Sequence, residues 1–91
     1  MGGGSSLKIE TKSDGDLTIV WVIGRIRSED LKELQRQVNI NSERVILDLG
    51  EVTVVDAAVV RFLSASEQAG ITLAHCPAYV REWILRERAE G

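Results

Sequence analysis

Residues 45–63, VILDLGEVTVVDAAVVRFL, read as a hydrophobic strand, a short turn and the beginning of a helix. Asp56 opens the expected helix, and residues 57–60 of its first turn are all apolar. The N-terminus of a helix offers free backbone N–H groups and the positive end of the helix dipole to a partner. Because no polar side chain follows the aspartate in this turn, we expect a partner to dock here without being anchored by side-chain chemistry.

Two strand-like segments precede this unit, at residues 7–11 and 16–26. Lys12 to Gly15 separate them, and the Asp14-Gly15 pair supplies the left-handed backbone that a tight reversal requires, so we expect a hairpin. The second segment has apolar side chains on both faces, which is typical of a central strand. They are Leu17, Ile19, Trp21 and Ile23 on one face, and Val20 and Val22 on the other.

A helix is expected next, with Ser28 as its N-cap and two acidic residues in the first turn, where the helix dipole favours them. Three apolar residues at helical spacing form its buried stripe, and two asparagines are expected to end it. The stripe is Leu31, Leu34 and Val38, and the asparagines are Asn39 and Asn41.

The remaining elements alternate between strand and helix. A strand at residues 44–49 precedes a helix at residues 56–69 that Gly70 ends, and a fourth strand covers residues 71–76. Pro77 suits the first position of a third helix, because its missing N–H is not needed there. The apolar positions are Val45, Leu47 and Leu49 in the strand, and Val80, Trp83 and Ile84 in the last helix. The order ββαβαβα predicts an α/β fold, with a mixed four-stranded sheet packed against helices and one antiparallel hairpin strand.

Composition limits the classes of function. A chain of 91 residues with 44% hydrophobic residues can form one small core, so we expect one domain at residues 7–91, after a flexible leader or non-native remnant at residues 1–6. The net charge of −3 disfavours nucleic acid as a partner. No apolar run approaches the roughly 20 residues that span a bilayer, so we expect a cytoplasmic protein without membrane insertion. A single cysteine fits a reducing compartment.

The second helix has two opposite faces when it is drawn at 100° per residue. The face expected to pack on the sheet carries Ala58, Phe62, Ala65 and Ala69, with Val59 and Leu63 beside them. The opposite face carries Ala57 and Val60 among polar residues, namely Arg61, Ser64, Glu67 and Gln68. Two interpretations remain open for these two apolar residues: ordinary scattered exposure, or a small docking patch.

Candidate catalytic groups are few. Capping of the helix accounts for Asp56, and only Glu51 and Arg61 lie near it in the sequence, which is too little for acid–base catalysis. His75 and Cys76 suggest a Cys–His nucleophile, but adjacent residues of a strand point to opposite faces. We therefore expect no enzyme activity, no cofactor and no metal, and keep small-ligand binding or thiol chemistry at these two residues as a third hypothesis. Tyr79 and Trp83 are interpreted as packing residues, not as a ligand platform.

The segment VILDLGEVTVVDAA followed by a helix resembles the STAS domain, the fold of anti-sigma factor antagonists and of the cytoplasmic tails of sulfate transporters. The resemblance covers residues 7–87 and includes the GRI sequence at residues 24–26. Its strongest part is the hydrophobic strand that ends in Asp48 and Leu49 and leads to Val54, Val55 and Asp56.

The resemblance also indicates what this chain lacks. In the antagonists this turn reads Asp-Ser-Ser-Gly, and a partner kinase phosphorylates the serine that follows the aspartate. Asp56 matches that aspartate, but Ala57 stands at the phosphorylated serine, Ala58 at the second serine and Val59 at the glycine. Arg27 stands where the family often has an acidic residue. Phosphorylation at the usual position is therefore not expected.

The leading expectation is a non-enzymatic STAS-like interaction module that acts as an unswitched antagonist or scaffold. Its partner would be an anti-sigma factor or a kinase-like protein. The alternative is an accessory subunit of a membrane system for lipid or anion transport, and a homodimer is also open. The residues expected to bind the partner come from the start of the second helix and from the loop at residues 25–28: Arg25, Arg27, Ser28, Asp56, Ala57, Val60, Arg61 and Ser64.

Overall fold

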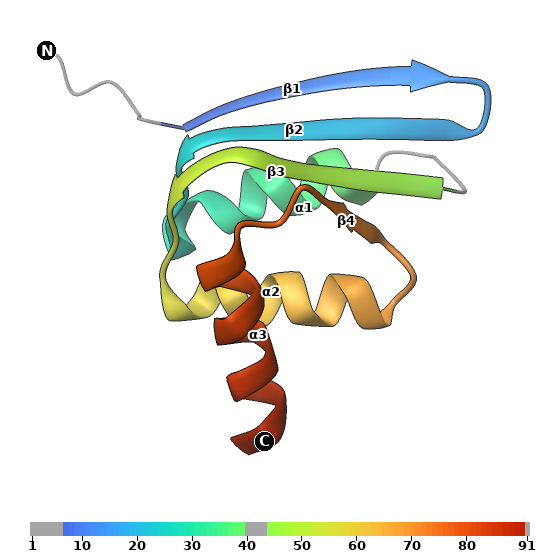
Figure 1. The fold of residues 1–91 in the computed structure, drawn as a ribbon. Coiled ribbons are helices and arrows are strands. Elements are labelled where there is room, and N and C mark those ends of the chain that lie inside the picture. The colour runs from blue at the N-terminus through green and yellow to red at the C-terminus, as the bar shows by residue number, and fades with distance from the viewer. Residues whose placement is uncertain (1–6, 40–43, 91) are drawn as a thin grey trace, which may run out of the picture.

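Four strands form one sheet in the order β1-β2-β3-β4 in the computed structural model, which describes residues 7–39 and 44–90 (Figure 1). β1 pairs antiparallel with β2, and β3 pairs parallel with both β2 and β4. The expected mixed sheet, the order ββαβαβα and the central place of the second strand are therefore confirmed. The strands are β1 Leu7–Asp14, β2 Leu17–Arg25, β3 Arg44–Val54 and β4 Thr72–Ala74, and the helices are α1 Leu31–Asn39, α2 Ala57–Gln68 and α3 Ala78–Glu90.

The β1–β2 hairpin is tighter than expected. β1 continues to Asp14, which pairs with Leu17, so the reversal has only two residues, Gly15 and Asp16. Gly15 has φ 66°, a left-handed conformation that glycine adopts without the steric cost of a Cβ. The prediction that β1 ends at Thr11 was wrong. The polar residues after Thr11 continue the regular antiparallel pairing with β2 as far as Asp14.

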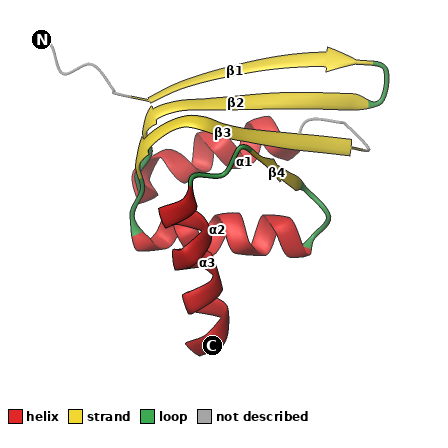
Figure 2. Cartoon of the chain, in the orientation of Figure 1, coloured by secondary structure: helices red, strands yellow, loops and turns green. Residues whose placement is uncertain are grey.

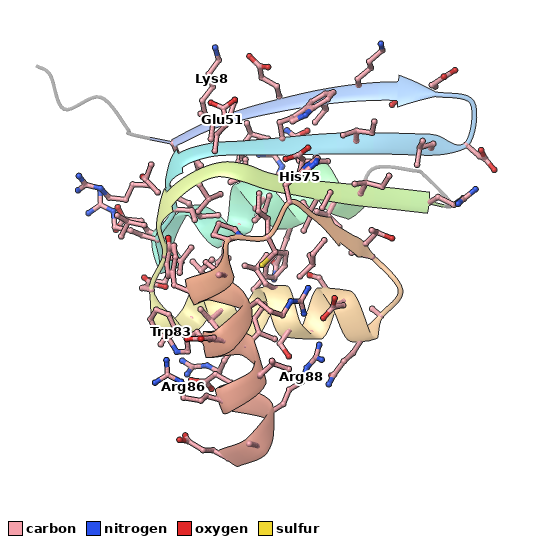
Figure 3. All side chains as sticks on the ribbon, viewed as in Figure 1. Lys8, Glu51, His75, Trp83, Arg86 and Arg88 are labelled. Atoms are coloured by element: carbon pink, nitrogen blue, oxygen red, sulfur yellow. The ribbon has the colours of Figure 1, made fainter. Side chains whose placement is uncertain are left out.

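All three helices cover the same face of the sheet (Figure 2). The residues that point to this face form the core with apolar residues of the helices, and among them Val20, Val22, Leu47, Val59 and Ile84 are almost fully buried. No helix formed by residues 7–39 or 44–90 covers the opposite face, and Figure 3 shows Lys8, Glu51 and His75 on that side. The apolar residues of β2 on the open face are only half-buried: Leu17, Ile19, Trp21 and Ile23.

Several predicted boundaries shift at the ends of elements. β3 continues five residues beyond Leu49, whereas β4 has only three residues. A 3-10 helix at Ser28–Asp30 precedes α1, and the residue at its N-cap is Arg27, so the prediction that Ser28 is the cap was wrong. Pro77 lies just before α3, where its carbonyl accepts bonds from the N–H groups of Val80 and Arg81. The predicted stop at Asn41 falls outside the described residues.

α2 is buried on a different face from the predicted one. Val59 and Leu63 are buried as expected, but Ala65 and Ala69 are exposed, and Val60 and Ser64 are only 0% and 8% exposed. The reason is α3, which packs on the flank of α2 that was expected to face solvent. The prediction that Val60 and Ser64 belong to an exposed docking patch was therefore wrong.

A cluster of charged residues joins α3 to α2. Arg81 donates to both carboxylate oxygens of Glu67, at 2.8 and 3.0 Å, and Arg88 donates to the same carboxylate at 2.8 Å and to the Ser64 hydroxyl at 3.0 Å. The hydrogen bond from Arg81, aided by Arg88, lowers the pKa of Glu67 against the opposing effect of burial. Glu67 in turn raises the pKa of Arg81. Ser64 is thus a structural residue in the packing of α3.

Candidate docking surface at the start of α2

Asp56 connects two loops that are far apart in the sequence. Its Oδ1 accepts a hydrogen bond of 3.0 Å from the N–H of Val59, which caps α2, and its Oδ2 accepts one of 2.8 Å from the N–H of Ser28. The predicted cap of α2 is confirmed, and the second bond brings the β2–α1 loop against the β3–α2 loop. In the same place the N–H of Ile26 donates to the Val54 carbonyl at 2.9 Å.

The environment of Asp56 favours its charged form. Burial of the carboxyl group raises its pKa, but hydrogen bonds from the backbone N–H groups of Val59, Ser28 and Ala58 outweigh burial and lower the pKa of Asp56 below its usual value. The carboxylate is therefore used to hold both loops, and the structural interpretation of this residue is sufficient to explain its position.

We expect Asp56→Ala to destabilise the domain by about 1–2 kcal/mol at pH 7, the usual cost of losing a cap, with the inter-loop bond adding to it. Because the folded pKa of Asp56 lies below its unfolded value, its contribution is complete above the unfolded pKa and is lost as the pH falls through the folded pKa. The difference between wild type and Asp56→Ala in urea unfolding should therefore shrink as the pH falls below the ordinary pKa of an aspartate, about 4. An equal difference at pH 7 and pH 2 would contradict this assignment.

The structure brings several of the predicted docking residues together, because Asp56 accepts a hydrogen bond from Ser28 and Arg25 pairs with the end of β3. Arg25, Arg27, Ser28 and Arg61 are exposed, and Asp56 and Ala57 are half-buried beside them. Val60 and Ser64 are excluded because both are buried, and the Ser64 hydroxyl accepts a hydrogen bond from Arg88 of α3. Val54 was missed by the sequence analysis, although it pairs with Arg25 at the end of β3 and its side chain is 49% exposed. We call this set the α2-start surface: Arg25, Arg27, Ser28, Val54, Asp56, Ala57 and Arg61.

A residue of α3 supports this surface from one side. The Tyr79 hydroxyl donates a hydrogen bond of 2.8 Å to the carbonyl of Thr53, which precedes Val54. This bond fixes the end of β3, and the Tyr79 side chain is still 45% exposed. Alternation along the strand does not identify Val54, because Thr53 and Val54 are both exposed where the strand ends.

The α2-start surface also carries exposed arginine side chains. Among the described residues, Arg27 forms a long ion pair with Glu29 at 3.9 Å and Arg61 forms one with Glu87 at 4.0 Å, and both arginine side chains are more than half exposed. Exposed pairs of this kind contribute little to stability. The arginines are therefore free to exchange these partners for carboxylates of another protein, as arginine does at interfaces.

His75 and Cys76 have different surroundings. The Nδ1 of His75 lies 3.0 Å from Oδ2 of Asp48 on the open sheet face, beside a hollow of about 260 Å³ that Trp21 also lines. Cys76 instead packs half-buried against the core, and burial raises the pKa of its thiol, which reduces the reactive thiolate at neutral pH. The Asp48–His75 contact was not predicted, because it joins β3 to the residue after β4.

Within residues 7–39 and 44–90, no three His, Cys, Asp or Glu side chains lie close enough together to hold a metal ion. No helix in the same ranges is both long enough and apolar enough to cross a bilayer. Compared with known protein-family models and with curated proteins, the sequence matches none of them.

Proposed function

We propose that this domain is a non-enzymatic protein-interaction module, similar in role to the STAS-type anti-sigma factor antagonists that its sequence resembles, and that its partner binds the α2-start surface. The observation that carries the proposal is the 49% exposure of Val54, three residues before the half-buried Ala57, together with the exposed arginines Arg25, Arg27 and Arg61 on neighbouring segments. An apolar centre with a charged rim is the usual anatomy of a protein interface. The partner then presents apolar side chains and carboxylates.

The interaction is not switched by phosphorylation at the start of α2. Ala57 has no hydroxyl group to accept a phosphate, and it occupies the first turn of α2, directly after the Asp56 cap. A phosphate there would add about −1.5 to −2 charges to the surface at neutral pH. With alanine at this position the surface keeps one charge state, so the module acts as a constitutive antagonist or scaffold.

Val54→Asp should weaken the complex with the partner at least tenfold, because it places a charge in the apolar centre of the interface. Leu85→Asp is the matched control, since Leu85 is 53% exposed on α3 and lies outside the α2-start surface. The chain is used to capture proteins from extract of the source cell, and each captured protein is measured against both variants. Equal losses with both variants, or no loss with Val54→Asp, would contradict the proposal.

The identity of the captured protein distinguishes the antagonist role from the accessory role in membrane transport. An anti-sigma factor or a kinase-like protein that depends on Val54 supports the antagonist role. A transporter ATPase or permease with the same dependence supports the accessory role in membrane transport. Either partner is expected to show acidic residues around an apolar contact.

A further inference from the structure

β1 is an edge strand with a long exposed side. It pairs only with β2 in the described sheet, and Figure 1 shows it as the outermost strand, away from α3. Its residues from Glu10 to Asp14 are all exposed. An edge strand of eight residues presents a row of backbone groups that can pair with another strand. The free edge of β1 can therefore accept a further strand.

The turn determines which backbone groups of β1 face outward. Asp14 and Leu17 close a two-residue turn, and the closing pair of such a turn is hydrogen-bonded. Because hydrogen-bonded pairs alternate along an antiparallel ladder, the even-numbered residues of β1 bond to β2. The N–H and C=O groups of Ile9, Thr11 and Ser13 therefore point to the free edge.

The side chains of the even-numbered residues lie on the open face, opposite Ile23, Trp21, Ile19 and Leu17 of β2, and their charges alternate in sign. They are Lys8, Glu10, Lys12 and Asp14. A second β1 placed antiparallel, with Thr11 opposite Thr11, puts Lys8 opposite Asp14 and Glu10 opposite Lys12. Each pair occurs twice by symmetry, and all are of opposite charge. The outward backbone groups of Ile9 and Ser13 then face each other in the same register.

A shift by an odd number of residues is disfavoured, because it places outward backbone groups opposite inward ones. Shifts by an even number are disfavoured by charge or by length. A shift of two residues places Lys8 opposite Lys12 and Glu10 opposite itself, or Glu10 opposite Asp14 and Lys12 opposite itself. Like charges directly opposite each other destabilise strand pairing. A shift of four residues restores opposite charges but pairs at most five of the eight residues of β1.

We propose that the partner of the β1 edge is a second copy of this chain, paired antiparallel about Thr11, so that two sheets join into one. Lys8 and Glu10 of one strand form an ion pair of 3.1 Å, and both side chains are more than half exposed. Such a pair contributes little to stability, so ion pairs between the two copies can replace it. The open face then continues across both copies. This surface is distinct from the α2-start surface, and the proposal does not depend on the proposed function.

Charge reversal and charge exchange on the full chain test the proposal. We expect sedimentation equilibrium at low salt to show dimers of the wild type, and Lys8→Glu to raise the dimer Kd at least tenfold, since it places two acids opposite each other twice. The double variant Lys8→Glu with Asp14→Lys should return the Kd to within about threefold of wild type. Relief of repulsion within one strand cannot explain such a rescue, because the double variant has more like-charged neighbours in its own strand.

A wild type that stays monomeric at millimolar concentration would overturn the proposal, because the charges would then only keep edges apart. Equal Kd values for the single and double variants would overturn it as well. Far-UV circular dichroism and thermal unfolding establish that each variant is folded before its Kd is used.

A cysteine at the two-fold axis tests the register. In a Cys76→Ala background, Thr11→Cys should form a disulfide-linked dimer with oxidised glutathione, because a hydrogen-bonded pair places its Cα atoms about 5.5 Å apart. Ser13→Cys is the control, since two such residues lie opposite Ile9 and not opposite each other. Equal cross-linking of the two variants would overturn the proposed register.

Discussion

Val60→Asp is expected to unfold most of the protein at 25 °C, with a loss of more than about 4 kcal/mol. Val60 is 0% exposed, so the variant loses the packing of a fully buried side chain and must bury a carboxylate in its place. Losses of this size approach the total stability of a small domain. Circular dichroism and urea unfolding measure the effect.

Ala65→Asp is the control for this prediction. Ala65 is exposed on the same helix, and its replacement should destabilise the domain by no more than about 1 kcal/mol, most of it from the lower helix propensity of aspartate. If Val60→Asp unfolded at the same urea concentration as the wild type, the assignment of Val60 to the core would be wrong. Val60 would then be a surface residue, as the sequence predicted.

Ala57→Glu is expected to weaken partner binding about a hundredfold, or ~2.7 kcal/mol, while the domain stays folded. The new carboxylate stands in the centre of the α2-start surface, where it is desolvated on binding and meets the carboxylates expected on the partner. An acidic residue in the first turn of a helix is favoured by the helix dipole, so stability should be unchanged or rise by about 0.3–1 kcal/mol. Isothermal titration calorimetry with the captured partner and urea unfolding give the two quantities.

The opposite directions of these two effects make the prediction specific. Ala65→Glu adds the same charge two turns further along α2 and should leave the affinity within about threefold of wild type. A variant at position 57 that binds as tightly as wild type would remove Ala57 from the interface. The role of the start of α2 would then be structural, as it is for Asp56.

The strands and their order followed from local patterns. Apolar residues alternate around Val20 and Leu47, and this alternation predicts strands. The Asp-Gly pair predicts the hairpin turn, because glycine adopts the left-handed backbone that the turn needs. The strand–helix alternation then leaves parallel pairing of β2, β3 and β4 as the simple solution. The strands and the hairpin depend on interactions between residues close in the sequence, and the strand order depends on the length of the connections.

The buried face of α2 could not be predicted in the same way. Alanine is compatible with both burial and exposure, so Ala58, Ala65 and Ala69 did not identify the face that packs. The position of α3 depends on Glu67 and on the two arginines that bind it, which are 14 and 21 residues away. In the sequence alone, these charged residues are typical of a solvent-exposed helix face, although in the structure they join α2 and α3.

The α2-start surface was predicted in part. The cap at Asp56 was predicted from the residue type at the start of the helix, and the loop at residues 25–28 was predicted from the family resemblance. The two segments lie together because the carboxyl ends of adjacent parallel strands meet at one edge of the sheet. The exposure of Val54 depends on where β3 ends beside Arg25, and on the bond from Tyr79 to Thr53, neither of which has a local signal.

The claim that a partner binds the α2-start surface is tested most directly by amide hydrogen exchange of the chain with and without its captured partner. We predict that the bound partner slows exchange in peptides covering residues 24–31 and 52–58, and that exchange in the C-terminal half of α3 changes little. Protection confined to β1, or to the open face of the sheet, would contradict it.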